Sequence, residues 1–181
     1  MYKRQEFGGC FLNKRLNRNN DGGTTRRTTD IFQLATTVLF QNPVQNFALA
    51  PNNLKDVSPV CMDYMKTIPT TWDETCFIDG YPGKYVVLAR RHGGTWYVAA
   101  INAGKETLKL KLDLEMFAGK TVSLYKDDKK GAPQLVPLKV KENGKVQLEI
   151  LPQGGAVLVN KLMIVLPFVV GSCGNDCSVK V

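Results

Sequence analysis

The chain has 181 residues, of which 44% are hydrophobic and 22% charged, a composition typical of a globular protein. Half of its net charge of +8 lies in residues 1–30, which hold seven Lys and Arg against three Asp and Glu. In residues 31–161 the lysines alternate with apolar residues, as on a solvated strand face. Because no aromatic RNA-binding motif or recognition helix accompanies this charge, the sequence does not predict a nucleic-acid-binding protein.

Both ends of the chain differ from the part between them. Residues 1–5 are polar and aperiodic, and we interpret them as the translation of a sequencing adaptor. Residues 162–181 break the preceding pattern, and their origin is left open between a native extension and frame run-off. Their apolar run of nine residues, 162–170, is shorter than the roughly 20 residues that a membrane-spanning helix needs, and no signal peptide is visible. The sequence predicts no membrane span.

The five cysteines give little information about chemistry or compartment. Cys10, Cys61 and Cys76 are isolated, whereas Cys173 and Cys177 lie close together. A zinc site needs four ligands in a tetrahedron, and no histidine lies near the last two cysteines. A local disulfide in this tail is left open.

The first part of the chain has the pattern of an α/β unit. Residues 6–30 are rich in Gly, Asn, Thr and Arg and are predicted to form a loop. Residues 31–40 place apolar side chains at helical spacing after the cap candidate Thr29. A strand at 44–49 and a helix at 57–65 follow.

One such unit cannot close a parallel sheet, because its helices must pack on strands that the unit lacks. Residues 6–66 are therefore predicted to be the incomplete end of a (β/α)8 barrel whose earlier strands lie upstream. On this interpretation the helix at 31–40 and the strand at 44–49 expose apolar surface.

From residue 85 the pattern changes to strands and turns. Seven strands are predicted at 85–90, 95–100, 108–114, 121–125, 134–140, 146–150 and 156–159. Short strands with turn signals between them predict an antiparallel β-sandwich. The predicted fold is mainly β, with a sandwich at 67–161 preceded by the helix-strand-helix remnant of a barrel.

Five motifs follow one another in this chain: Gln33-Leu34-Ala35, Asn42-Pro43-Val44-Gln45, Pro51-Asn52-Asn53-Leu54, Pro69-Thr70-Thr71-Trp72-Asp73-Glu74-Thr75 and Ala89-Arg90-Arg91. Over residues 7–159 they resemble the C-terminal part of glycoside hydrolase family 97, the bacterial α-glucosidases and α-galactosidases. The resemblance implies a (β/α)8 catalytic barrel flanked by two β-sandwiches, of which this chain would hold the barrel end and the C-terminal sandwich. Two residues depart from the family pattern: Phe32 stands in place of a histidine and Leu49 in place of an acid.

The resemblance also implies a function for a longer parent enzyme. That parent would be a periplasmic or secreted hydrolase of carbohydrate metabolism acting on α-linked oligosaccharides. Its catalytic carboxylates and calcium-binding glutamates would lie upstream of residue 6, so neither a catalytic residue nor a metal ligand is predicted in this chain. The sequence leaves open whether the bond is glucosidic or galactosidic, and whether its configuration is retained or inverted.

Trp72, Asp73 and Glu74 lie where the α/β pattern ends and the strand pattern begins. Glycoside hydrolysis needs two carboxylates about 5 to 9.5 Å apart across one bond, whereas adjacent residues in a strand point to opposite faces. We interpret Trp72 as filling an interdomain gap and the acidic residues as capping linker backbone. Arg90 and Arg91 are expected on opposite strand faces, one of them paired with a carboxylate at the domain interface.

Other candidate site residues have structural explanations. His92 has no acidic or nucleophilic neighbour and is expected to be an exposed turn residue. The turn acids Asp127 and Asp128 are too few to hold calcium, which takes about six oxygens.

We therefore interpret the chain as the C-terminal fragment of an α-glycoside hydrolase, inactive alone, whose sandwich stabilises the barrel. The alternative is a non-catalytic carbohydrate-binding or structural sandwich. Trp96, Tyr97 and Tyr125 could form a sugar-stacking face, but Trp96 and Tyr97 alternate in one strand, so core packing is favoured.

Overall fold

The structure is a computed structural model that describes residues 7–12, 15, 24–41, 43–49 and 51–161. Three of the sequence interpretations lie outside the described residues: the adaptor at 1–5, the tail at 162–181, and the Cys173–Cys177 pair.

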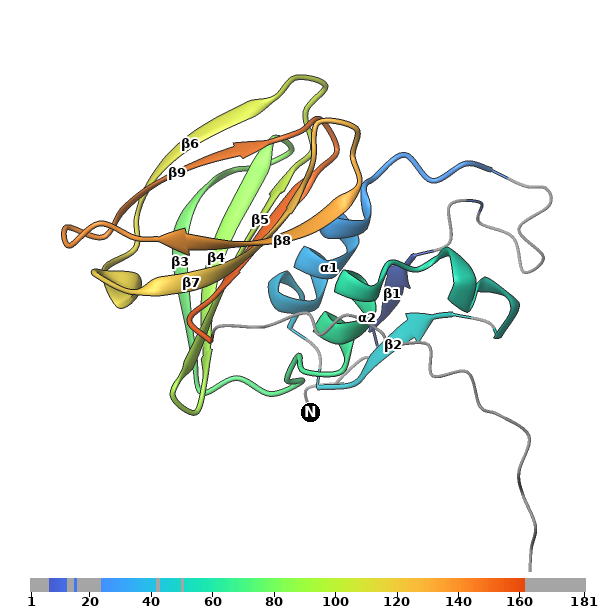
Figure 1. The fold of residues 1–181 in the computed structure, drawn as a ribbon, viewed down its shortest axis with the longest axis horizontal. Coiled ribbons are helices and arrows are strands. Elements are labelled where there is room, and N and C mark those ends of the chain that lie inside the picture. The colour runs from blue at the N-terminus through green and yellow to red at the C-terminus, as the bar shows by residue number, and fades with distance from the viewer. Residues whose placement is uncertain (1–6, 13–14, 16–23, 42, 50, 162–181) are drawn as a thin grey trace, which may run out of the picture.

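The first part of the chain forms a small α/β unit. Its elements are β1 (Phe7–Phe11), α1 (Asp30–Leu39), β2 (Gln45–Ala48), the 3-10 helix η1 (Pro51–Asp56) and α2 (Pro59–Met65). β1 pairs with β2 in parallel, so β1, α1 and β2 make a β-α-β connection (Figure 1). The prediction of a loop over 6–30 was wrong for Phe7–Phe11: the adjacent Gly8 and Gly9 resemble loop composition, and the register with β2 is irregular there.

Eight strands follow, and they confirm the antiparallel sandwich. They are β3 (Glu74–Tyr81), β4 (Tyr85–His92), β5 (Thr95–Asn102), β6 (Leu108–Asp113), β7 (Thr121–Asp127), β8 (Pro133–Lys139), β9 (Lys145–Ile150) and β10 (Gly155–Val159), with the short helix η2 (Glu115–Phe117) before β7. Six of them form one antiparallel sheet in the order β3-β4-β5-β10-β7-β8, which we call the shared sheet. β6 and β9 form a separate outer sheet (Figure 1).

All seven strands predicted for the sandwich are present, and β3 is the one sandwich strand that the sequence did not predict. Its pairing with β4 shifts between Phe77 and Asp79, as at a β-bulge, and Phe77 is 67% exposed. Both features disturb the alternation of apolar and polar residues that reveals a strand.

One face of the shared sheet packs against the outer sheet. Val98 and Ala100 of β5 and Leu158 of β10 meet Leu110 and Leu148 of the outer sheet in a continuous apolar core. The outer strands read as alternating apolar and charged residues because their other side faces water.

The other face of the shared sheet packs against α1 and α2. Ile31, Leu34 and Val38 of α1 have no exposed surface, and they share a core with Tyr97 of β5 and Val157 of β10. The helix and its sheet can approach closely because Gly155 lies under the start of α1, where a Cβ would come within 2.8 Å of the backbone of Ile31 and Phe32.

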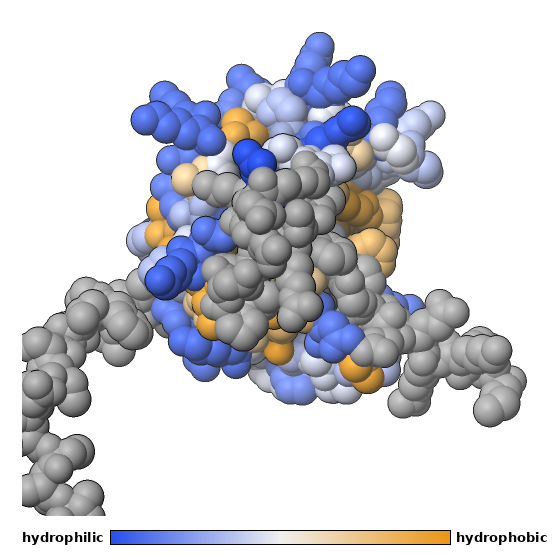
Figure 2. All heavy atoms as spheres, turned by 90° about the vertical axis from the view of Figure 1, so that its right-hand side faces the viewer, coloured by the Kyte–Doolittle hydropathy of each residue, from blue (hydrophilic) through white to orange (hydrophobic). Residues whose placement is uncertain are grey.

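This packing corrects the expectation that the helix at 31–40 exposes its apolar face. The sandwich supplies the missing partner of α1, so among the described residues of this region the exposed large apolar side chains are Phe40, Val44 and Leu54. On the side of the molecule where α2 and β2 lie, Figure 2 shows hydrophobic patches interrupted by hydrophilic residues. Among the described residues, no helix is long and apolar enough to cross a membrane.

Candidate functional site

The junction between α1 and the sandwich contains the site residues that the sequence singled out. Arg90 extends from β4 toward the C-terminal end of α1 and is 3% exposed. Its Nη1 donates a hydrogen bond of 2.9 Å to the carbonyl of Phe40, and its Nη2 donates one of 3.4 Å to that of Leu39. The last turn of α1 has no basic residue, so Arg90 supplies the positive charge that stabilises a helix C-terminus.

Trp72 completes the cover over this guanidinium. Its ring lies 5.7 Å from Arg90 Cζ, within the range of a cation–π contact, and 5.3 Å from the ring of Tyr97 in an edge-to-face arrangement. The indole Nε1 and Arg90 Nε are buried and have no hydrogen-bond partner among the described residues. Burial lowers the pKa of the Arg90 guanidinium from its ordinary value.

Asp73 and Glu74 both contact Arg91 rather than pointing to opposite faces. Asp73 lies just before β3 and is therefore outside the strand geometry on which the expectation depended. Its Oδ2 is 3.7 Å from Arg91 Nη1, and Glu74 Oε2 is 3.2 Å from Arg91 Nε. Asp73 Oδ2 also accepts a 2.7 Å hydrogen bond from the Gly93 amide. Both acids therefore bind Arg91, and Asp73 also binds the backbone of the β4–β5 turn.

The two arginines divide the roles that the sequence left open. Arg91 is partly exposed and makes the carboxylate pairs, whereas the buried Arg90 binds main-chain carbonyls of α1. His92 is exposed, and its Nδ1 lies 2.9 Å from the carbonyl of Thr71. Each of these side chains therefore holds two segments of this chain together.

The N-terminal end of α1 is also held by the sandwich. The N-cap hydroxyl of Thr29 accepts from the Phe32 amide at 3.1 Å and donates to Asp127 Oδ2 of β7 at 2.8 Å. The amide of Gly155 donates to the same carboxylate oxygen at 3.2 Å. Burial raises the pKa of Asp127 to about 6, against the hydrogen bonds from Thr29 and Gly155, which favour its charged form.

The two turn acids do not form a metal site. Asp127 faces α1, while Asp128 Oδ1 accepts hydrogen bonds from the amides of Lys130 and Ala132. Within the described residues, no group of three or more His, Cys, Asp and Glu side chains lies close enough to hold a metal.

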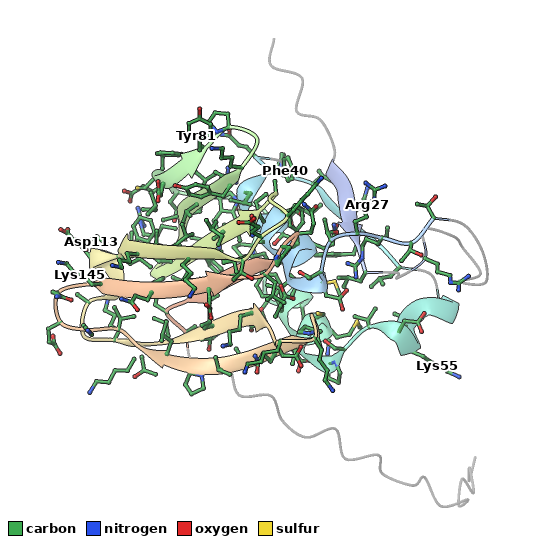
Figure 3. All side chains as sticks on the ribbon, turned by 90° about the horizontal axis from the view of Figure 1, so that it is seen from above. Arg27, Phe40, Lys55, Tyr81, Asp113 and Lys145 are labelled. Atoms are coloured by element: carbon green, nitrogen blue, oxygen red, sulfur yellow. The ribbon has the colours of Figure 1, made fainter. Side chains whose placement is uncertain are left out.

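The aromatic residues considered as a sugar platform are separated by the shared sheet. Tyr97 and Tyr125 are buried on the α1 side, and Trp96 packs on the side of the outer sheet. Phe77 and Tyr81, at 67% and 58% exposure, are the most exposed large apolar side chains of the described sandwich. They line a surface cavity of about 350 Å³ at the β3–β4 turn, and Tyr81 lies at the edge of the molecule in Figure 3.

A family model described as "Glycosyl-hydrolase 97 C-terminal, oligomerisation" matches residues 71–161, about half of the chain. The chain belongs to glycoside hydrolase family 97. The matched residues include Trp72, Asp73, Glu74, Arg90 and Arg91, and they begin just before β3.

Similar proteins cover the α/β unit as well. A β-arabinopyranosidase of known crystal structure has 84% sequence identity to this chain and a TM-score of 0.83, over 85% of this chain and 24% of that one. A retaining α-galactosidase of Bacteroides thetaiotaomicron is 31% identical over 133 residues, 70% of this chain and 20% of the relative. A family 97 enzyme of Pseudoalteromonas sp. strain K8, solved with panose, has the same fold with a TM-score of 0.66 at 23% identity, over 82% of this chain and 25% of that one. The chain thus corresponds to about a quarter or less of the length of these enzymes.

The two departures from the family pattern lie on the α/β unit. Phe32 is half-buried in the first turn of α1, next to Gly155. Leu49 is half-buried after β2 and packs against the core between α1 and the shared sheet.

Replacing Arg90 by methionine tests its role at the end of α1. Arg90→Met keeps the apolar stem but removes the guanidinium from the two partly buried carbonyls at the end of α1, so we expect the free energy of unfolding to fall by about 2 kcal/mol. Arg91→Met is the matched control: its ion pairs are exposed, and we expect a loss below about 1 kcal/mol. Urea unfolding of both variants measures the difference, and equal losses would contradict the assignment.

The buried carboxylate of Asp127 predicts a pH dependence of stability. Its native pKa of about 6 lies above the ordinary value of 3.8, so its contribution to stability is complete at acid pH and is lost as the pH rises through about 6. Asp127→Asn is therefore expected to raise the unfolding free energy at pH 7, on the order of 1 kcal/mol, with a smaller gain at pH 5.

Asp128→Asn is the control for this effect. Backbone hydrogen bonds lower the pKa of Asp128, so its contribution to stability has the opposite pH dependence, and no gain is expected at pH 7. Thermal unfolding at pH 5 and pH 7 distinguishes the two variants. An Asp127→Asn protein whose gain is the same at both pH values would rule out this explanation.

Proposed function

We propose that this chain is the C-terminal region of a family 97 glycosidase that acts on galactose-configured substrates, including β-arabinopyranosides. The observation that carries the proposal is the 84% identity to a β-arabinopyranosidase. β-L-arabinopyranose has the ring configuration of α-D-galactopyranose without the hydroxymethyl group, so the name of the α-galactosidase relative describes the same stereochemistry. Glucose differs from both at the 4-hydroxyl.

In this proposal the chain supports catalysis without supplying the carboxylates. A retaining mechanism needs two carboxyl groups about 5 to 5.5 Å apart, one acting as nucleophile and the other as acid and base. Asp73 and Glu74 are held by Arg91, which leaves these roles to residues upstream. The catalytic face of a (β/α)8 barrel is formed by loops that follow its strands, and the loop after β1 leads into α1, so anchoring the N-terminal end of α1 would fix where that loop ends.

The same proposal assigns the calcium ligands of the parent to upstream residues. It also includes the periplasmic or secreted location that the family resemblance implies for the parent.

Hydrolysis by the full-length parent tests the substrate assignment. We expect kcat/KM for an aryl β-L-arabinopyranoside and an aryl α-D-galactoside to exceed that for an aryl α-D-glucoside by about 100-fold or more, because a site built to bind the axial 4-hydroxyl rejects its epimer. The 181-residue chain alone should hydrolyse none of them. Preferred hydrolysis of the glucoside would overturn the substrate class, and turnover by the isolated chain would overturn the supporting role.

A second function, assembly of the parent into oligomers, is favoured by the exposed aromatic residues on β3. β3 is an edge strand, and Phe77 and Tyr81 leave apolar surface beside it. The matched family model names oligomerisation in its description. We propose that this edge contacts a second copy of the enzyme.

The oligomeric state of the parent tests this second function. Phe77→Ser with Tyr81→Ser is expected to shift the parent toward the monomer in size-exclusion chromatography with light scattering. Val44→Ser with Leu54→Ser removes two other exposed apolar side chains and should leave the mass unchanged. A parent that is monomeric before any substitution would disprove the assignment.

A further inference from the structure

A groove at the far end of the sandwich gathers four lysines. The groove has a volume of about 540 Å³ and lies where β6, β8 and β9 come together. Lys111, Lys139, Lys141 and Lys145 line it, and we call it the lysine groove. Its volume is within the range of about 300 to 1,000 Å³ that small-molecule sites occupy.

The charge of the lysine groove is not neutralised by the described residues. None of its four lysines makes an ion pair there, although Lys109 on the same outer sheet pairs with Glu149 at 3.4 Å. Asp113 is the one acidic residue among the lining side chains. A concave surface that concentrates charge of one sign attracts ligands of the opposite sign.

The lysine groove lies away from the surface that a barrel would cover. The outer sheet packs on one face of the shared sheet, and α1 packs on the opposite face. In Figure 3, Asp113 and Lys145 lie together at one end of the molecule, and Arg27 and Lys55 lie at the other. A ligand in the lysine groove would therefore not compete with the contact between the α/β unit and the sandwich.

The other lining residues suit a sugar better than a nucleic acid. Gln147 and Asp113 can exchange hydrogen bonds with hydroxyl groups, and Leu138 offers an apolar contact for a pyranose ring. No aromatic side chain lines the groove, so the stacking that single-stranded nucleic acids use is missing.

We propose that the lysine groove binds an anionic carbohydrate, a uronate-bearing oligosaccharide whose carboxylates pair with the lysines. The choice of a carbohydrate rests on the proposed glycosidase function, whereas the negative charge rests on the groove itself. The lysine groove would hold the parent enzyme on an acidic polysaccharide while the active site of the barrel hydrolyses neutral sugar branches of that polysaccharide.

Isothermal titration of the 181-residue chain with oligogalacturonate tests the proposal. We expect saturable binding that weakens as salt is added, and none to a neutral galactan oligosaccharide of equal length. Lys139→Gln with Lys141→Gln should weaken binding about five- to tenfold, the loss expected for two exposed charge contacts. Lys129→Gln with Lys130→Gln removes the same charge from another exposed turn and should leave the affinity unchanged.

Three results would overturn the proposal: no binding of oligogalacturonate, an equal loss in both double variants, or equally tight binding of a single-stranded DNA of the same charge. Equal melting temperatures of the variants show that folding is intact. The titration needs no hydrolysis, so it separates a failure of the groove from a failure of the glycosidase assignment, which the kinetics of the parent would reveal.

Discussion

The structure depends on the anchoring of one helix at both of its ends. Helix α1 brings no basic residue to its last turn, and a buried guanidinium from β4 binds the carbonyls left open there. At the other end, the cap residue Thr29 belongs to the helix and at the same time hydrogen-bonds to β7. Because both anchors come from the shared sheet, the helix cannot slide or rotate on that sheet without breaking one of them.

This anchoring makes the two parts of the chain one packed body. Tyr64 of α2 meets Tyr125 of β7 edge to face, with ring centroids 4.9 Å apart, and Thr37 of α1 lies 3.1 Å from the Tyr64 hydroxyl. The shared sheet is therefore covered on both faces, which explains why every residue of β10 is buried. The residues that the family model describes as C-terminal therefore share a hydrophobic core with the α/β unit that precedes them.

The sequence predicted the sandwich well because apolar and polar residues alternate along its strands and turn-forming residues such as Gly, Asn and Asp separate them. Strands β4 to β10 were all placed within two residues, and helix α1 followed its apolar periodicity. β1 and β3 were missed because glycines interrupt one and a bulge shifts the other. Periodicity could place Arg90 and Arg91 on opposite faces of β4, but it could not show what each face contacts.

The site depends on contacts between residues far apart in the chain. Asp127 was grouped with Asp128 as a turn acid, yet it reaches Thr29, 98 positions earlier. Arg90 reaches Phe40 over 50 positions. The local sequence pattern carries no information on such pairs, because the residues around Arg90 or Asp127 would be the same if the side chain bound a different partner. The burial of one side of β4 and β7 becomes visible only when the helix that covers it is in place.

The burial of the shared sheet on both faces has a consequence for where this family of enzymes can be divided. The family-model match begins at residue 71, but the core on the helix side reaches back to Leu12. A protein cut at residue 71 would turn a row of aromatic and aliphatic side chains toward water: Tyr97, Ala99, Tyr125, Val157 and Val159. Natural recombination or engineered fusion at that point would leave this face uncovered, whereas a cut before β1 would keep the whole cover, including Leu12, with the sheet.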